Sequence, residues 1–350
     1  MRDFKTYKII MNKTIVFIFG SIFSIVFNSC SSNVDSSDIQ QSNTNTVYVC
    51  GYESTGVLNK AKFWKNGIST ELNGVNTGIS NSIFKSGSDI YIGGYEFNGT
   101  KNVAKIWKNG VGTSLTDGIN NACVYSVFVF NNDVYASGYE YSGAIKVAKY
   151  WKNGIATSLT DGIQDSEGFS IFVYNNDVYV AGITNGVIST ATMWKNGNPT
   201  LLTSGGNYTI ANSIFVSNGD VYVSGFDNDG AKITATYWKN GVANPLVNHS
   251  QDSSANSIFV KDNDVFVVGS EYNGSFQVAR LWKNGIATTL SDNTKISYAQ
   301  NIFVDGTDVY IVGRELNNSK YIGKVWKNGN EILTINNSPN DVILKSILVF

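Results

Sequence analysis

The amino-acid sequence predicts an all-β protein assembled from seven copies of one four-stranded unit. The tetrapeptide Trp-Lys-Asn-Gly occurs seven times and includes every tryptophan of the chain, at spacings of 43 or 44 residues. Short apolar runs that end in glycine recur in the same register. A fixed period of this length indicates a repeat architecture in which each copy is one supersecondary unit.

Each repeat carries three markers that stay in phase along the chain. The first marker is the tryptophan of the tetrapeptide, at Trp64, Trp107, Trp151, Trp194, Trp238, Trp282 and Trp326. The second is a glycine that ends an apolar run, at Gly51, Gly94, Gly138, Gly182, Gly225, Gly269 and Gly313. The third is an aspartate ahead of that run, at Asp89, Asp133, Asp177, Asp220, Asp264 and Asp308, with Thr46 in its place in the first repeat.

Four short strands are expected in each repeat. In the third repeat they cover residues 126–130, 134–140, 146–151 and 155–160. The Asn-Gly pair of the tetrapeptide separates the third strand from the fourth, and both residues tolerate the positive φ angles of a type I′ hairpin turn. Several strands are apolar on both faces, so each sheet needs a neighbour on either side.

Sheets buried on both faces and repeated seven times predict a seven-bladed β-propeller with four antiparallel strands per blade. The first repeat begins at its second strand, near Thr46, while the chain ends with the apolar stretch 346–350, which matches the first strand of a unit. Pairing of the N-terminal and C-terminal segments in one blade therefore closes the predicted ring and removes two exposed sheet edges.

The tryptophans are expected to fill the widening space between adjacent blades, because a large ring at one register in every repeat suits core packing. Stacking of the same rings on sugars is the alternative. The lysine that follows each tryptophan is expected to stay solvated. Cys50 and Cys123 fall in different repeats and are expected to remain separate thiols.

Composition excludes several functional classes. The net charge is −1 and charged residues make up 15% of the chain, so no basic surface for nucleic acid is expected. His249 is the only histidine, which argues against a histidine-rich metal centre and a Ser-His-Asp triad. We expect no catalytic residue set, metal or cofactor, although paired carboxylates for glycoside hydrolysis stay open as an alternative.

The first thirty residues have the pattern of an export signal. Basic residues precede a largely apolar run over residues 14–27, which is too short to span a bilayer. Cys30 follows shortly after this run, and the arrangement resembles a bacterial lipoprotein signal, in which such a cysteine receives the lipid. We therefore expect a signal peptide over 1–29, a lipidated N-terminus and flexible tether over 30–45, and the propeller over 46–350. Plain secretion and a membrane anchor are the alternatives.

Candidate ligand-binding residues lie on the face that carries the crossovers between blades, called the top face below. The crossovers differ from blade to blade, whereas the turns on the opposite face are uniform, so the top face is freer to specialise. The aromatic and histidine candidates are Tyr125, Phe169, Tyr208, His249 and Tyr298. The acidic candidates follow the strand glycines, at Glu53, Glu96, Glu140, Asp227, Glu271 and Glu315. Ordinary loop surface is the alternative reading of both sets.

The Trp-Lys-Asn-Gly repeats and the lipoprotein-type signal together resemble the repeat lipoproteins found among secreted proteins of Gram-negative bacteria. A weaker similarity links the apolar run, glycine and tryptophan to kelch repeats. The resemblance implies a monomeric lipoprotein in the cell envelope, at the outer membrane or cell surface. The variable top face on a uniform scaffold, without a catalytic residue set, further predicts that the protein binds a protein or glycan ligand without catalysis. It is expected to contact the membrane only through its lipid. A polysaccharide lyase or glycosidase and a multivalent lectin are the alternatives.

Overall fold

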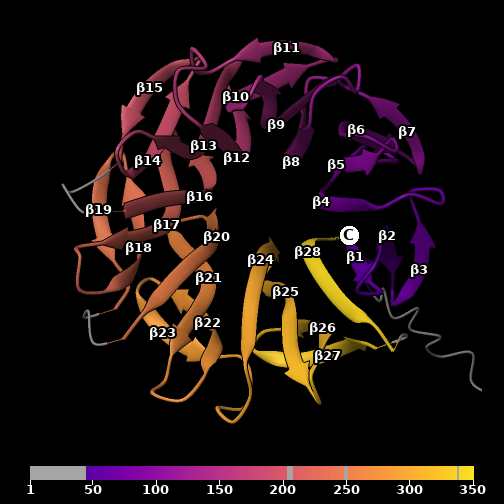
Figure 1. Cartoon of the computed structure of the whole chain (residues 1–350). Coiled ribbons are helices and arrows are strands. Elements are labelled where there is room, and N and C mark those ends of the chain that lie inside the picture. Colours follow the sequence, from indigo (N-terminus) through magenta and orange to yellow (C-terminus); the bar gives the residue numbers. More distant parts are fainter. Residues whose placement is uncertain (1–44, 203–207, 248–250, 337–338) are drawn as a thin grey trace, which may run out of the picture. The chain divides into compact units, whose positions relative to one another are not determined.

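The computed structural model describes residues 45–202, 208–247, 251–336 and 339–350. The described strands form seven four-stranded antiparallel sheets around a central channel, and they belong to the compact unit Asn45–Phe350 (Figure 1). The predicted signal peptide, Cys30, the tether up to residue 44 and His249 lie outside the described residues. No helix in the described ranges is long and apolar enough to cross a membrane.

The strands take the same four positions in every blade. The innermost strands are β28 (Asp341–Val349), β4 (Gly78–Ser86), β8 (Ala122–Phe130), β12 (Ser166–Tyr174), β16 (Tyr208–Ser217), β20 (Ser253–Lys261) and β24 (Ser297–Asp305). The second strands are β1 (Val47–Ser54), β5 (Asp89–Phe97), β9 (Asp133–Ser142), β13 (Asp177–Asn185), β17 (Asp220–Asn228), β21 (Asp264–Tyr272) and β25 (Asp308–Asn317).

The third strands are β2 (Asn59–Lys65), β6 (Asn102–Lys108), β10 (Ile145–Lys152), β14 (Ser189–Lys195), β18 (Ile233–Lys239), β22 (Gln277–Lys283) and β26 (Lys320–Lys327). The outermost strands are β3 (Ile68–Glu71), β7 (Val111–Ser114), β11 (Ile155–Ser158), β15 (Asn198–Leu201), β19 (Val242–Pro245), β23 (Ile286–Thr289) and β27 (Asn330–Ile335). We number the blades from the one that contains β1.

Blade 1 contains both ends of the described chain, which confirms the predicted ring closure. Its strand order is β28-β1-β2-β3, and Val47 pairs with Val349 at the end of the ladder. The ring of Phe350 also stacks on Tyr48, with 5.0 Å between the ring centroids. Pairing β28 with β1 satisfies backbone groups that would otherwise form a free sheet edge.

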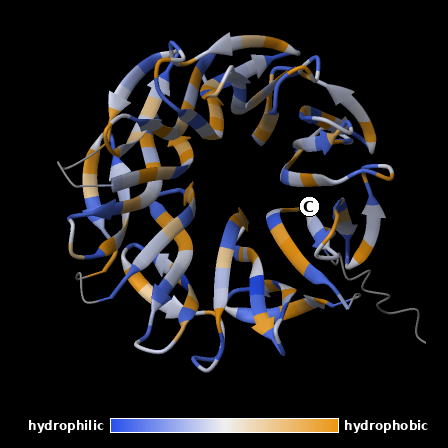
Figure 2. Ribbon diagram, viewed as in Figure 1, coloured by the Kyte–Doolittle hydropathy of each residue, from blue (hydrophilic) through white to orange (hydrophobic). Residues whose placement is uncertain are grey.

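Every tryptophan of the chain is buried between blades, as predicted. The exposed fraction of these side chains is at most 2%. Trp151 of blade 3, for example, packs against Tyr91, Ala104 and Ile106 of blade 2. Figure 2 shows hydrophobic segments on the strands all around the ring, which is the pattern of sheets that bury both faces.

The Lys-Asn-Gly turns form hairpins with positive φ at both central residues, as predicted: φ is 51° at Asn109 and 85° at Gly110. The turn also explains why the aspartate occupies the same position in repeats 2 to 7. Asn109 Nδ2 donates to Asp89 Oδ1 at 2.8 Å, and Lys108 Nζ lies 2.7 Å from Asp89 Oδ2. The lysines are therefore half-exposed and paired with an aspartate of their own blade in blades 2 to 7, rather than simply solvated.

The innermost strands begin earlier than the sequence predicts. In blade 3 the expected first strand starts at residue 126, whereas β8 starts at Ala122. The difference arises from a β-bulge: the pairing of β8 with β9 skips Tyr125, between Val124 and Ser126. An extra residue interrupts the alternation of side chains along a strand, so the segment ahead of it resembled a loop.

The strand glycine of each repeat lies opposite this bulge. A Cβ atom added to Gly138 would lie 1.8 Å from the carbonyl oxygen of Cys123, and the equivalent distance is 1.8–2.0 Å at the other six marker glycines. No side chain fits at such a distance. The glycine marker therefore exists because the bulged inner strand approaches the second strand too closely for any other residue.

Replacement of Gly138 with alanine should lower the free energy of unfolding by about 3 kcal/mol, because backbone must move to admit the methyl group. Ser137→Ala is the matched control, since Ser137 is adjacent and its buried hydroxyl has no hydrogen-bond partner. This control should change stability by less than about 1 kcal/mol. Urea denaturation of both variants measures the difference, and equal effects would contradict the role given to the glycine.

Candidate functional site at the channel mouth

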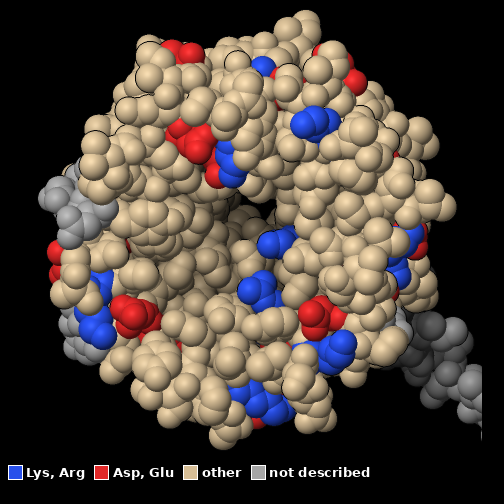
Figure 3. Space-filling model, in the orientation of Figure 1, with Lys and Arg blue, Asp and Glu red and all other residues tan. Residues whose placement is uncertain are grey.

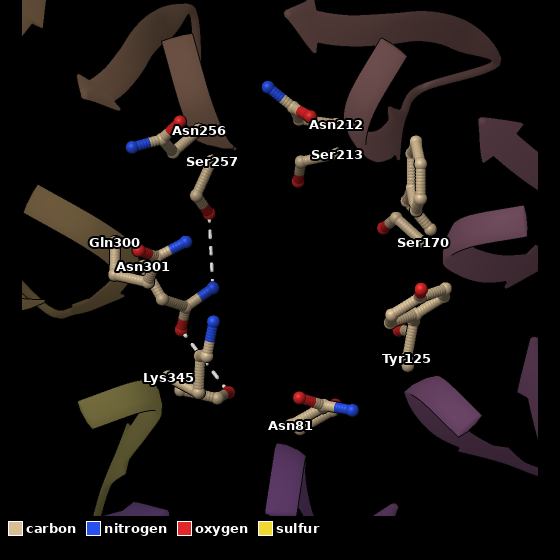
Figure 4. Close-up of a pocket in the computed structure, with 14 residues that line it drawn as sticks. Asn81, Tyr125, Ser170, Asn212, Ser213, Asn256, Ser257, Gln300, Asn301 and Lys345 are labelled. Atoms are coloured by element: carbon tan, nitrogen blue, oxygen red, sulfur yellow. Dashed lines mark hydrogen bonds between the residues drawn. The ribbon is translucent and has the colours of Figure 1, made fainter. Parts of the chain in front are cut away.

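The bulges place one residue from each blade at the top end of the central channel. Together with the residue that follows each bulge, they line a cavity of about 230 Å³ (Figure 4). The bulge residues are Asn81, Tyr125, Phe169, Asn212, Asn256, Gln300 and Lys345. The residues that follow them are Ser82, Ser126, Ser170, Ser213, Ser257, Asn301 and Ser346. We call this cavity the channel mouth.

The serines and asparagines of the channel mouth satisfy the free edges of the innermost strands. Ser82 Oγ accepts a hydrogen bond from the backbone N–H of Val127 in the next blade at 3.2 Å. Asn81 Nδ2 donates to the carbonyl oxygen of Val124 at 2.8 Å. Asn212 and Asn256 make the same type of contact with Ala255 and Ala299. These side chains therefore link neighbouring blades where no further strand can pair.

Four bulge residues depart from asparagine: Tyr125, Phe169, Gln300 and Lys345. They occupy the position that asparagine uses in blades 2, 5 and 6, so the scaffold does not require their particular side chains. In Figure 4 Tyr125 and Lys345 lie on opposite sides of the channel mouth. The departures therefore make the mouth asymmetric, with an aromatic side and a basic side.

Below the mouth, the channel is lined by a belt of phenylalanines three residues after the bulges. The belt consists of Phe84, Phe128, Phe172, Phe215, Phe259 and Phe303, with Leu348 in the equivalent position of blade 1. Neighbouring rings have centroids 4.7–5.8 Å apart. A cavity of about 390 Å³ in this belt adjoins the channel mouth through the serines. The belt gives the polar mouth an apolar floor.

The aromatic side of the mouth is held by a buried carboxylate. Tyr125 Oη donates to Glu167 Oε2 at 2.6 Å, and Lys146 Nζ lies 2.9 Å from Glu167 Oε1. Burial raises the pKa of the Tyr125 hydroxyl far above its ordinary value, and the neighbouring acidic groups act in the same direction. Phe169 packs edge-on against the Tyr125 ring at 5.3 Å. Tyr125 is thus a fixed neutral hydrogen-bond donor, and its ring is available for packing.

The basic side of the mouth holds a lysine with no polar partner among the described residues. Lys345 forms no hydrogen bond or ion pair there. Burial lowers the pKa of its ammonium group, and the positive charge of Arg314 lowers this pKa further. Figure 3 shows basic side chains at the edge of the central opening, with acidic groups farther out over the blades. Among the described residues, no carboxylate forms an ion pair with Lys345.

Arg314 follows the marker glycine of blade 7 and packs against two tyrosine rings. Its guanidinium carbon is 4.6 Å from the ring centroid of Tyr298 and 5.1 Å from that of Tyr321. Nη1 donates to Gln300 Oε1 at 3.5 Å, while the buried Nε has no partner among the described residues. The two ring centroids are 6.5 Å apart, so the rings pack against the guanidinium group from adjacent sides, and these contacts restrict its orientation.

The predicted aromatic candidates lie on innermost strands, which corrects their expected placement in crossover loops. Tyr125 and Phe169 line the channel mouth. Tyr298 lies beside Arg314, outside the lining residues of the mouth. Tyr208 packs on Phe226 with 5.5 Å between ring centroids and is 37% exposed. The bulges cause this correction, because they extend each innermost strand into the segment that the sequence assigns to a loop.

The predicted acidic candidates are mostly engaged in ion pairs. Each pair joins the second strand to the third strand of the same blade: Glu53 with Lys62, Glu96 with Lys105, Glu140 with Lys149, and Glu271 with Arg280. Glu315 pairs with Lys295 at 3.2 Å. Asp227 lies on β17 opposite Thr209 and Thr234. None of the six lines the channel mouth.

Lys345, Arg314, Gln300 and Glu167 are site residues that the sequence interpretation missed. The sequence contained a signal for Lys345, Gln300 and Arg314. Lys345 and Gln300 stand immediately before the serine or asparagine of the first-strand motif, where other blades carry asparagine. Superposing the seven repeats on that motif would have shown one variable column. Arg314 stands in a second variable column, directly after the marker glycine, where other blades carry Tyr52, Tyr95 or Phe226.

The side chains that line the channel mouth are aromatic, neutral polar and basic. No group of three or more His, Cys, Asp or Glu side chains in these ranges is arranged to hold a metal ion. Cys50 and Cys123 are separate buried thiols, as expected, and burial raises the pKa of each to about 12. The channel mouth offers aromatic rings, amides, hydroxyls and a basic group, which are the groups that fix a small polar ligand.

Comparison with known proteins supports the fold alone. No protein-family model and no curated protein matches the chain. An acylaminoacyl peptidase from Pyrococcus horikoshii is similar in structure, with a TM-score of 0.51 and 11% identity, over 83% of this chain and 50% of that one. TolB from Acinetobacter baumannii has a TM-score of 0.48 and 10% identity, over 69% of this chain and 61% of TolB. The chain thus spans about half the length of the peptidase.

Together the closed ring of seven four-stranded blades and its channel define the chain as a seven-bladed β-propeller. Within the described residues, the clearest candidate site is the channel mouth. The mouth combines a uniform supporting ring of serines with bulge residues that differ between blades. This contrast separates the residues that hold the propeller together from those free to contact a ligand.

Replacement of Lys345 with asparagine, the bulge residue of blades 2, 5 and 6, should raise the free energy of unfolding by about 1 kcal/mol at neutral pH. The substitution removes a partly buried charge that has no ion-pair partner among the described residues. Asparagine can also bond across to the next blade, as Asn81 does. Urea denaturation of the wild type and the variant measures the change.

The difference in stability between the wild type and Lys345→Asn should depend on pH in a defined direction. The pKa of Lys345 is lower in the folded state than in the unfolded state. The unfolded chain therefore binds more protons between these two values, and wild-type stability rises with pH through that interval. The advantage of the variant should be largest at neutral pH and shrink as pH approaches about 10.4. A constant difference would contradict the burial of an unpaired charge.

Proposed function

We propose that this protein is a non-catalytic binding module of the cell envelope, anchored by lipid at Cys30, which binds a protein or glycan ligand in the channel mouth. The observation that carries the proposal is the variation of the bulge residues on an otherwise uniform scaffold. Asparagine at this position links neighbouring blades, and four blades carry a different residue there. Loss of a stabilising residue at a solvent-accessible cavity supports a role in recognition.

The distribution of carboxylates favours binding over the lyase or glycosidase alternative. Glycoside hydrolysis uses two carboxyl groups that face the scissile bond. Glu167 is the carboxylate nearest the aromatic side of the mouth, and it is held by both Lys146 and Tyr125. The top-face glutamates form ion pairs within their own blades. These carboxylates already contact basic side chains of the protein, so they are not free to face a scissile bond.

The convergence of seven bulges on one channel favours a single site over the multivalent lectin alternative. A lectin with one site between each pair of blades needs similar ligand groups in every blade. The bulge residues instead differ and meet at one cavity. The proposal therefore expects one ligand molecule per chain by titration calorimetry.

The double substitution Tyr125→Asn and Phe169→Asn should weaken ligand binding at least tenfold, because it removes both aromatic surfaces of the mouth. Asparagine occupies the same bulge position in other blades, so the fold should be retained. A glycan array and affinity capture from envelope extracts, followed by calorimetry with the ligand recovered, provide the measurement.

Tyr272→Asn is the control for this experiment, since Tyr272 is an aromatic residue on β21 that does not line the mouth. It should leave binding unchanged. Equal loss in both variants would refute the assignment of the site. Turnover of a polysaccharide that is abolished by a single Glu or Asp substitution would establish the enzyme alternative instead.

The anchor is tested separately at Cys30. In a Gram-negative host, Cys30→Ser should abolish incorporation of radiolabelled palmitate and move the protein from the membrane fraction to the soluble fraction. Lipid attachment requires the thiol, whereas serine preserves the size of the side chain. Cys50→Ser is the control and should retain the label. Incorporation that survives Cys30→Ser would refute the proposed anchor.

A further inference from the structure

Resting on the proposed function, we propose that the ligand is an acidic saccharide, whose anionic substituent is bound by Lys345 and Arg314 and whose hydroxyl groups are bound by the amides of the channel mouth. The argument uses the cation pair, the shape of the cavities and the hydrogen-bonding groups left free in the ring. Each of these features is a property of blades 7 and 1 or of the shared mouth.

The two cations belong to adjoining cavities. Lys345 lines the channel mouth and also a cavity of about 340 Å³ between blades 7 and 1. Arg314, Tyr52, Tyr321 and Asp341 line this second cavity. Lys345 lines both cavities. One ligand could therefore place a substituent near Lys345 and Arg314 while the rest of the molecule occupies the channel mouth.

Neither cation is neutralised by a described carboxylate. Asp341 is the acidic residue in the second cavity, and its Oδ1 accepts a hydrogen bond from the backbone N–H of Tyr321 at 2.8 Å. It forms no ion pair with Arg314 or Lys345. Glu167, on the opposite side of the mouth, is paired with Lys146. An anionic ligand group would therefore supply the compensation that the chain does not provide.

Arg314 is prepared for a planar or tetrahedral anion. The rings of Tyr298 and Tyr321 pack against the guanidinium group from adjacent sides, and among the described residues only the long contact to Gln300 uses its edge. The buried Nε of Arg314 has no partner among the described residues. Such a preorganised fork binds carboxylate or sulfate oxygens with two parallel hydrogen bonds. Lys345 adds a second charge with three unused donors.

The amides of the mouth indicate a ligand rich in hydroxyl groups. Asn81 and Asn212 donate through Nδ2 to carbonyl oxygens of the next blade, and this contact fixes which end of each amide is the acceptor. Their Oδ1 atoms accept no hydrogen bond from the described residues and are open to donors from a ligand. A sugar offers several hydroxyl donors and an apolar ring face that packs on aromatic residues such as Tyr125 and Phe169. A peptide C-terminus offers the anion but few such donors, so the acidic saccharide fits better.

The experiment uses titration calorimetry of the full chain with four probes: trigalacturonate, a sulfated disaccharide, neutral maltotriose and a tripeptide with a free carboxylate. We expect at least one acidic sugar to bind at least tenfold more tightly than maltotriose and the tripeptide. The two acidic probes distinguish carboxylate from sulfate as the anion. Affinity should also fall as salt concentration rises, because the contact is between charges.

Variants test the residues directly. Lys345→Asn and Arg314→Tyr each install the residue found at the same position in other blades, so both should fold. Each should weaken binding of the acidic sugar at least tenfold without changing the affinity for maltotriose. Lys101→Asn is the control, since Lys101 lies in the turn between β5 and β6 of blade 2 and does not line either cavity. It should leave all affinities unchanged.

The outcomes separate this inference from the proposed function. Tighter binding of maltotriose or of the tripeptide, lost on Tyr125→Asn with Phe169→Asn, would overturn the acidic-saccharide assignment while retaining the binding module. Binding of acidic sugars that both cation variants leave unchanged would overturn the assignment of Lys345 and Arg314. Binding of none of the four probes would overturn the inference, and absence of any captured ligand in the array and extract experiments would overturn the proposed function as well.

Discussion

The structure depends on the close approach of a bulged inner strand to a glycine on the second strand, repeated in every blade. The distance leaves no room for a Cβ atom, so the glycine is obligatory wherever the bulge occurs. The bulge in turn directs one extra residue per blade into the channel. A single backbone constraint thus creates both the second sequence marker and the ring of residues that forms the channel mouth.

Uniform and variable positions occupy different parts of the repeat. The buried tryptophans recur because each blade must pack against the next, whereas the contacts of lysine and asparagine with aspartate recur because they fix the turns within each blade. The channel mouth relaxes this rule at Tyr125, Phe169, Gln300 and Lys345. An unpaired lysine in a confined cavity lowers the stability of the fold. Binding sites commonly retain residues that lower stability in this way.

Most of the fold could be predicted from sequence because its determinants are local and periodic. Asn-Gly turns, apolar runs and the tryptophan register each act within one repeat, and repetition makes them visible seven times. Ring closure was also predictable, since the stretch 346–350 matches a first strand that the N-terminal repeat lacks. The starts of the innermost strands were not, because the residue inserted at Tyr125 and its equivalents breaks the alternation that identifies a strand.

The sequence by itself determined the seven-bladed ring, the buried tryptophans and the position of the hairpins, because these follow from chemistry repeated in each unit. Only the tertiary structure decided which variable residues meet. Lys345 and Tyr125 are more than 200 residues apart, and the ring brings them to one mouth. It also showed that Glu53, Glu140 and similar candidates are held by basic residues of their own blades. Convergence and charge pairing are properties of distances in space, which no single repeat encodes.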